Sequence, residues 1–485
     1  MGQQESLRII RTCLSRCRSD SFRCKIRNRS LIRLWGGNSR MKKKAAQWTL
    51  GGMLAVALTL TACGKTDNGT TADPNDSQAP VKSIAQEAAE VVFYSNNGDS
   101  AESFDYRFGV ALRKKFPNWT ITYIQREGAG TDLPDLLSAG TRFDIFFQSI
   151  GNFEAQAFPA GIQYDMTELI KRQGMDLSRL DATVVDAVKQ ASGGKLYGIP
   201  VFTNNLVLYY NKTIFDKFGV TYPKDGMRWE EMIDIAKKLT RNEGGVQYYG
   251  FSHSPTHTVR LNPLSIPNAD LQQVTPTINK DERWKQFYQA FYLDPMRGQG
   301  YLEGIQKLNK IPDHNMFVKD KTVGMFAYLS SLVYVWEEQF KGVDWDMVAL
   351  PTLDSQKGVG SQSYPTYFGL TAMARNKEAS MEALNYLISD EFQAAMARKG
   401  IMPVLKNDAI QKELGQDSIY KDKNWKAVFY NRFAPIPPKA DYDAGLVNEY
   451  VKAGNQIAFD KMDMNSALRQ AEEEGQKKIA AFKSK

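Results

Sequence analysis

Short apolar runs alternate with amphipathic helical stretches near the start of the main body of the chain, and this order restricts the fold more than any other feature. Glu90–Ser95, Trp119–Gln125 and Phe143–Gln148 are rich in β-branched and aromatic residues and are short enough for buried strands. Residues 100–115 and 132–139 between them have helical patterns of apolar residues. Strands that alternate with helices predict an α/β fold with a parallel sheet and right-handed crossovers.

Polar side chains follow these strands. In open α/β sheets, ligands bind beyond the carboxyl ends of the strands. Asn96 and Asn97 follow the first predicted strand, and Gln148 ends the third. Neutral amides both donate and accept hydrogen bonds, which suits them to sugar hydroxyls. The alternative for Asn96 and Asn97 is a plain turn that continues into Gly98.

The charge and the cysteines are both concentrated near the N-terminus. The formal net charge is +8, but residues 1–62 alone carry +11, which leaves −3 for residues 63–485. A mildly acidic body is poorly suited to a phosphate backbone, so no nucleic-acid partner is expected. The last of the four cysteines is Cys63, so no thiolate metal site or thiol nucleophile is expected after it. No cofactor is expected either.

A predicted targeting segment precedes the main body of the chain. From Met41, a cationic start leads into the uncharged run Trp48–Ala62, which is shorter than the ~20 residues of a membrane-spanning helix. This pattern predicts a secretory signal peptide over residues 41–62. Its end, Leu60-Thr61-Ala62-Cys63, resembles a bacterial lipobox. The resemblance implies that Cys63 becomes a lipidated N-terminus, which places the protein on the extracytoplasmic face of the cell membrane. A short membrane-anchor helix with a chance cysteine is the alternative.

The flanking segments complete this interpretation. Residues 63–83 hold the lipidated cysteine and a tether rich in Gly, Thr, Asp and Pro, a composition typical of flexible linkers. Residues 1–40 precede the cationic start at Met41, and Trp35-Gly36-Gly37 requires G-rich codons of the kind found in a ribosome-binding sequence. We interpret residues 1–40 as upstream DNA read as protein, with a genuine basic extension as the alternative. A peptide from this segment in mass spectra of the natively expressed precursor would contradict the interpretation.

A series of short motifs fills the rest of the chain. They are Gly194–Pro200, Leu208–Lys212, Ile214–Val220, Trp229–Met232, Lys321–Met325, Asp344–Pro351, Asn376–Gly400, Met402-Pro403 and Pro435–Pro437. In this order and spacing they resemble the family 1 extracellular solute-binding proteins of ABC importers, which mostly serve carbohydrate uptake. The resemblance covers about residues 88–485. Arg228 departs from the usual Thr or Ser, and Ser330-Ser331 stand where several sugar binders have Trp.

The resemblance implies a two-lobed, periplasmic-binding-protein-like (type II) α/β fold with crossing hinge segments and a cleft between the lobes. The first lobe would comprise residues 84–202 and 366–433, and the second 204–364 and 434–485. The crossings would lie near Val201–Asn205, Tyr364–Tyr367 and Phe433–Pro437. Asn204 and Asn205 support the first crossing, because they interrupt two apolar runs with residues that tolerate unusual backbone angles.

The expected ligand contacts are amides, hydroxyls and tyrosine rings at the strand ends and crossings. A flat aromatic ring packs well against the C–H face of a pyranose, while amides bind the hydroxyls. The predicted site residues are Asn96, Asn97, Gln148, Asn204, Asn205, Tyr328, Ser330, Tyr364 and Tyr367. His253 and His257 are interpreted as loop residues, with a ligand contact from His253 as the alternative. Asp443 is interpreted as a solvated charge.

The resulting expectation is a monomeric, non-enzymatic binder that delivers a sugar or oligosaccharide to the transmembrane permease subunits of an ABC importer. A surface-anchored carbohydrate hydrolase is the alternative, and it would need a pair of carboxylates at the cleft. No such pair follows the predicted strands. Within the binding class, a peptide, polyol or uronic acid remains open as the ligand.

Overall fold

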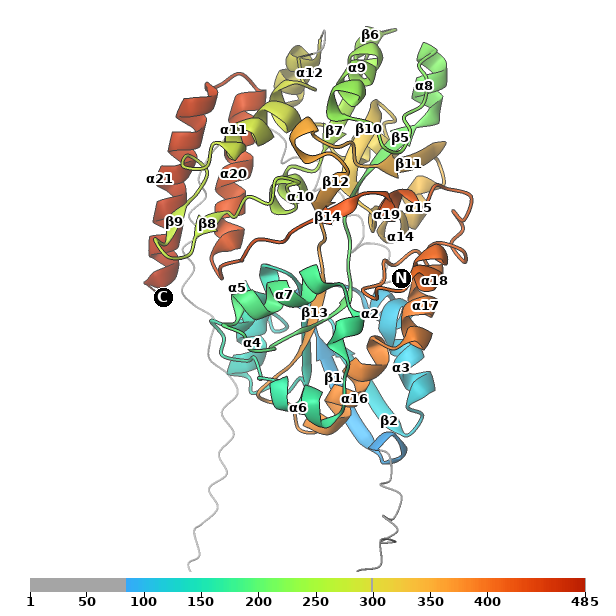
Figure 1. The fold of residues 1–485 in the computed structure, drawn as a ribbon, viewed down its shortest axis with the longest axis vertical. Coiled ribbons are helices and arrows are strands. Elements are labelled where there is room, and N and C mark those ends of the chain that lie inside the picture. The colour runs from blue at the N-terminus through green and yellow to red at the C-terminus, as the bar shows by residue number, and fades with distance from the viewer. Residues whose placement is uncertain (1–83, 298–299, 485) are drawn as a thin grey trace, which may run out of the picture. The chain divides into compact units, whose positions relative to one another are not determined.

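The computed structural model describes residues 84–297 and 300–484, so the predicted signal peptide, Cys63 and the predicted tether lie outside the described residues. The described part is built on two five-stranded sheets (Figure 1). We call each sheet with its covering helices a lobe. The first sheet has the spatial order β2 (Trp119–Ile124), β1 (Ala89–Tyr94), β3 (Ile145–Ser149), β13 (Thr366–Leu370) and β4 (Ile199–Phe202).

The three strands predicted from the apolar runs are confirmed, and β1 pairs in parallel with both β2 and β3. β13 runs antiparallel to β3 and β4, because it enters the sheet on its return from the other lobe. The predicted helix over residues 100–115 is also confirmed, as α2 (Ala101–Phe104), the π-helical η2 (Asp105–Gly109) and α3 (Val110–Lys115) in succession.

This helix buries one face against the first sheet. Phe104, Phe108 and Leu112 are fully buried, and the ring of Phe108 lies 5.2 Å from that of Phe368 on β13. The other helices of this lobe are η1 (Ile84–Gln86), α4 (Leu133–Ser138), α5 (Asn152–Ala157), α6 (Thr167–Arg172), η3 (Leu177–Arg179), α7 (Ala182–Ala191), α16 (Lys377–Leu387), α17 (Asp390–Arg398) and α18 (Asp408–Lys412).

The second sheet has the order β11 (Trp345–Ala349), β5 (Leu206–Asn211), β10 (Val323–Leu329), β7 (Val246–His253) and β6 (Arg241–Glu243). Trp229 and Trp345, which start a helix and a strand, are buried in the core of this lobe. The helices of this lobe are α8 (Lys212–Phe218), α9 (Trp229–Leu239), α10 (Pro255–Arg260), α11 (Arg283–Tyr288), η4 (Gln289–Leu293), α12 (Tyr301–Leu308), α13 (His314–Val318), α14 (Leu332–Val335), α15 (Glu337–Phe340), η5 (Asp354–Gln356), α19 (Ala427–Tyr430), α20 (Asp443–Ala458) and α21 (Met464–Lys483), with the short strands β8 (Ala269–Asp270) and β9 (Thr275–Pro276).

Two passages between the lobes lie side by side. The chain runs from β4 to β5 through residues 203–205, and from β12 (Val359–Gln362) to β13 through residues 363–365. The backbone N–H of Tyr364 donates to the carbonyl of Asn204 at 2.6 Å. The N–H of Ser330, which follows β10, donates to the carbonyl of Asn205 at 2.8 Å. The first bond therefore joins the two passages to each other, and the second joins the first passage to the end of β10 in the second lobe.

The third passage between the lobes lies earlier in the sequence than the predicted crossing near Phe433–Pro437. Asp417 still bonds to the first lobe, through its backbone N–H to the carbonyl of Arg398. Tyr420 already packs on the second lobe, where its ring lies 5.3 Å from that of Trp345. The following α19 packs on β11 and β5, and β14 (Arg432–Ala434) pairs with β12. Apolar residues of this segment, such as Val428, are buried there, which explains why it stays with the second sheet.

Candidate ligand-binding site

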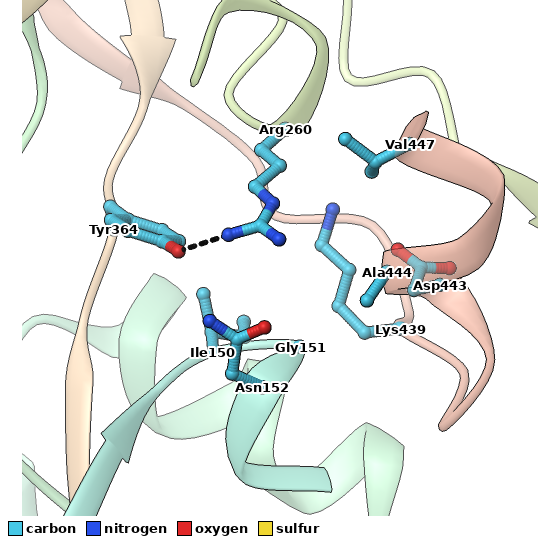
Figure 2. A pocket seen from close by; sticks show the side chains of 9 residues that line it. All are labelled: Ile150, Gly151, Asn152, Arg260, Tyr364, Lys439, Asp443, Ala444 and Val447. Carbon is cyan, nitrogen blue, oxygen red and sulfur yellow. Dashed lines mark hydrogen bonds between the residues drawn. The ribbon is translucent and has the colours of Figure 1, made fainter. Parts of the chain in front are cut away.

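A small cavity opens between the lobes beside the second passage (Figure 2). The volume that water-sized spheres can occupy is about 20 Å³, which is room for about one water molecule. Side chains from both lobes line it: Ile150, Gly151, Asn152, Arg260, Tyr364, Lys439, Asp443, Ala444 and Val447. Since a sugar ring is far larger, the lobes must separate for a sugar to enter here.

The first lobe contributes the loop that follows β3, as expected for the carboxyl end of a strand. Gly151 has a φ of +80°, which an L side chain rarely adopts, so a glycine is required where the chain turns into α5. Its N–H donates to the carboxylate of Glu154 at 2.6 Å. The side chain of Asn152 donates to Ser149 Oγ at 3.1 Å. The loop is thus held by its own polar side chains.

Tyr364 connects the two lobes through its hydroxyl. The hydroxyl lies 2.9 Å from Ser149 Oγ, which belongs to the first lobe. It also accepts a hydrogen bond of 2.8 Å from the guanidinium of Arg260, at the end of α10 in the second lobe. A group that enters the cavity would therefore meet the phenol and the guanidinium together, as Figure 2 shows.

Buried ionisable groups surround the cavity. Lys439 is only 9% exposed and Asp443, at the start of α20, only 4%. Burial lowers the pKa of Lys439 and raises that of Asp443. The opposite charge of each residue partly offsets the effect of burial on the pKa of the other. Glu154 lies behind the Gly151 turn, and burial raises its pKa to about 7. The interpretation of Asp443 as a solvated charge is wrong, because helix α20 turns it toward the lobe interface.

A row of partly buried rings leads away from the cavity along the second lobe. The ring of Tyr364 lies 6.1 Å from His257, which lies 5.0 Å from Tyr328. Tyr328 lies 6.1 Å from His314, and His314 lies 4.1 Å from Trp336. Tyr328, His257, His314 and Trp336 all keep part of their surface exposed. We call these five residues the aromatic row; such a surface can pack against the faces of successive sugar rings.

The histidines differ from the prediction. His253 ends β7, is fully buried and bonds to Thr258 Oγ1 at 3.0 Å, so it is a core residue. His257 belongs to α10, because Pro255 occupies the first position of that helix rather than breaking it. Burial, with Arg260 nearby, lowers the pKa of His257 to about 4, so the ring is neutral near pH 7. Neither residue is in a loop.

The predicted amides have mixed positions. Gln148 is buried, and its Oε1 has no hydrogen-bond partner among the described residues. Asn97 is exposed, whereas Asn96 accepts a hydrogen bond of 3.0 Å from the hydroxyl of Tyr94. Asn205 donates from its side chain to the carbonyl of Val428 at 2.8 Å. Asn204 and Asn205 both belong to the first passage between the lobes, and Ser330, at the end of β10, bonds to Asn205.

The two tyrosines predicted for the site near the second passage lie in different environments. Tyr364 lines the cavity, whereas Tyr367 is fully buried within the first lobe. The hydroxyl of Tyr367 donates to the carbonyl of Val184 at 2.8 Å, so the structure does not bring this side chain to the cavity. Asn152, Arg260 and Lys439 line the cavity although the sequence did not predict them. Only the position of Asn152 just after a strand could have indicated its role.

Comparison with known proteins identifies the family. Residues 95–394, more than half of the chain, match the model of the bacterial extracellular solute-binding proteins. The chain belongs to the bacterial extracellular solute-binding protein family. A stretch of 299 residues in this solute-binding protein is 23% identical to a candidate binding protein of Brucella abortus (strain 2308). That alignment covers 58% of this chain and 64% of the relative, so the chain spans slightly less than two thirds of the relative's length.

Solved structures support the fold of this solute-binding protein. An ABC substrate-binding protein of Listeria monocytogenes in complex with cycloalternan has a TM-score of 0.62 at 18% identity, with 81% of this chain and 100% of that chain covered. A sugar transporter protein of Rhizobium etli in an open conformation has a TM-score of 0.61 at 19% identity, with 81% and 99% covered. The predicted two-lobed α/β fold is confirmed.

None of the helices in the described residues is both long and apolar enough to cross a membrane. Within residues 84–297 and 300–484, no group of three or more His, Cys, Asp or Glu side chains could hold a metal ion.

Proposed function

We propose that this solute-binding protein captures a sugar or oligosaccharide outside the cell and delivers it to the permease of an ABC importer. In this proposal Cys63 carries the lipid that holds the protein at the membrane, and residues 63–83 let the two lobes reach the permease. The lipobox-like sequence and the solute-binding family support the anchored, extracytoplasmic location.

The observation that carries the proposal is the aromatic row beside the polar cavity between the lobes. Tyr328 and Trp336 offer flat apolar surface for sugar rings. Tyr364 and Arg260 offer hydrogen-bonding groups at one end of the row. Apolar faces with a few convergent polar groups are the usual composition of a small-molecule site. The cycloalternan bound to the Listeria protein supports a saccharide in particular.

A hydrolase would need two carboxylates facing the scissile bond. Glu154 and Asp443 lie in the same region, and the raised pKa of Glu154 would suit a general acid. However, Glu154 is fully buried and does not line the cavity, while its Oε2 is bound by the N–H of Gly151. The geometry therefore favours binding without catalysis.

Calorimetry of the purified protein against a panel of mono- and oligosaccharides tests the proposal. We expect binding of at least one saccharide and no turnover of it over hours. Tyr328→Ala should weaken that binding by roughly 5- to 150-fold, since it removes stacking and apolar burial worth about 1–3 kcal/mol. Tyr248→Ala, a partly buried tyrosine on β7, is the matched control. Enzyme-like hydrolysis would contradict the binding function.

A further inference from the structure

Two basic side chains reach the cavity without an acidic partner. Lys439 forms no ion pair within 4.0 Å and no side-chain hydrogen bond among the described residues, although it is only 9% exposed. Arg260 likewise has no carboxylate within that distance in the described part of the chain, and its guanidinium bonds only to the hydroxyl of Tyr364. A buried cation without a partner is costly, so such groups normally have one.

The two nearest acids point their oxygens elsewhere. Asp443 accepts from the side chain of Asn268 at 2.8 Å and from the N–H of Ala440 at 3.5 Å. Glu154 accepts from the N–H of Gly151 and lies behind the cavity wall. Burial raises the pKa of both carboxyl groups, to about 7 for Glu154, and so favours the neutral form of each.

The two cationic side chains are placed so that both could bind one planar anionic group. Figure 2 shows the guanidinium of Arg260 and the ammonium of Lys439 directed into the same space. They repel each other, since the charge of Arg260 lowers the pKa of Lys439. An anion between them would relieve this repulsion. The fork of an arginine binds two oxygens of a carboxylate or sulfate, and lysine adds a point charge.

We propose that the ligand is an acidic oligosaccharide, whose anionic group binds between Arg260 and Lys439 while its further rings follow the aromatic row from Tyr364 toward Trp336. This inference rests on the proposed saccharide-binding function and narrows it to one class of ligand. The anionic group is the carboxylate of a uronic acid or a sulfate ester; both present the same chemistry to the two cations.

The test compares saccharides that differ only in charge. Calorimetry would use uronic-acid oligomers from pectin, alginate and glucuronan, each beside its neutral methyl ester, and a sulfated oligosaccharide as a third arm. We expect one acid to bind roughly 10- to 100-fold more tightly than its ester, because charge-assisted hydrogen bonds are lost on esterification. Added salt should weaken binding of the acid more than that of the ester. Binding of the sulfated arm alone would retain the anionic class and assign the sulfate as the recognised group.

Variants locate the anion. Lys439→Met keeps most of the side-chain volume and should remove most of the preference for the acid over its ester. Lys237→Met on the exposed surface of α9 is the control and should retain the full preference. Equal affinity for acid and ester would overturn the inference and leave the saccharide-binding function intact. If the acid's advantage persists in a folded Lys439→Met protein, the assigned position is wrong. Failure to bind any saccharide, charged or neutral, would overturn the proposed function itself.

Discussion

Glu154 should make the free energy of unfolding depend on pH, and the substitution Glu154→Gln should remove this dependence. The carboxyl group is fully buried behind the Gly151 turn, and its Oε1 has no hydrogen-bond partner among the described residues. Burial raises its pKa from the ordinary value of 4.5 to about 7, and backbone hydrogen bonds offset only part of this. Glu154→Gln keeps the shape and an acceptor for the N–H of Gly151, but it cannot ionise.

The sign follows from proton binding. Between pH 4.5 and about 7, the unfolded chain has lost the proton of Glu154 while the folded protein still holds it. The free energy of unfolding therefore falls as pH rises through this window, and it stays lowered above it. A shift of this size corresponds to roughly 3 kcal/mol. The unfolding free energy of Glu154→Gln, minus that of the wild type, should thus be larger at pH 8 than at pH 4.5 by about this amount.

Urea unfolding followed by tryptophan fluorescence measures this difference from pH 4.5 to pH 8. Taking the difference between the two proteins cancels the titration of all other groups that behave alike in both. Glu168→Gln is the control, because this side chain on α6 is 83% exposed and should give a flat difference. A difference for Glu154→Gln that does not change with pH would refute the reasoning, and would mean that Glu154 is ionised in the folded state with Lys439 as its counter-charge.

Three further predictions concern the anchor, the motion and the contacts. Cys63→Ser should release the protein from the membrane fraction and abolish fatty-acid labelling, because it removes the thiol that would carry the diacylglyceryl group and stable anchoring needs two acyl chains. Labelling that persists would show that the lipobox interpretation is wrong. Saturating ligand should reduce the radius of gyration in small-angle scattering, because contacts to both lobes form only when the lobes close; an unchanged curve would speak against closure. Asn97→Ala, Gln148→Ala and Tyr364→Ala should each weaken binding by about 1–3 kcal/mol, or roughly 5- to 150-fold, measured by calorimetry alongside the melting temperature; unchanged affinity in a folded variant would remove that residue from the site.

The strands and the first helix could be predicted because their patterns are local. Alternation and helical spacing indicate which side of an element faces the core, as for Phe104 and Phe108. The antiparallel course of β13 could not be predicted in this way. The direction of β13 depends on where the chain returns from the second lobe, and no residue pattern within Thr366–Leu370 indicates this point of return.

The site was harder to predict for the same physical reason. Arg260 and Lys439 are far apart in sequence, and they meet only because α10 and α20 pack in one lobe. Tyr364 and Tyr367 are three residues apart and look equivalent in sequence. The first lies before β13 and the second within it, so one reaches the cavity and the other the core. Local composition cannot distinguish such neighbours.

The hydrogen bond that joins the first two passages has a mechanical consequence. A single flexible strand between lobes would permit twist, tilt and sliding, but two strands fixed to each other leave bending about their common line as the easy motion. The bond from the N–H of Tyr364 to the carbonyl of Asn204 supplies that constraint, and the bond from the N–H of Ser330 to the carbonyl of Asn205 fixes the first passage to the end of β10. A permease that contacts both lobes would then read one variable, the opening angle. A ligand too long for the cleft would hold this angle at an intermediate value, so the protein would report ligand size as well as ligand presence.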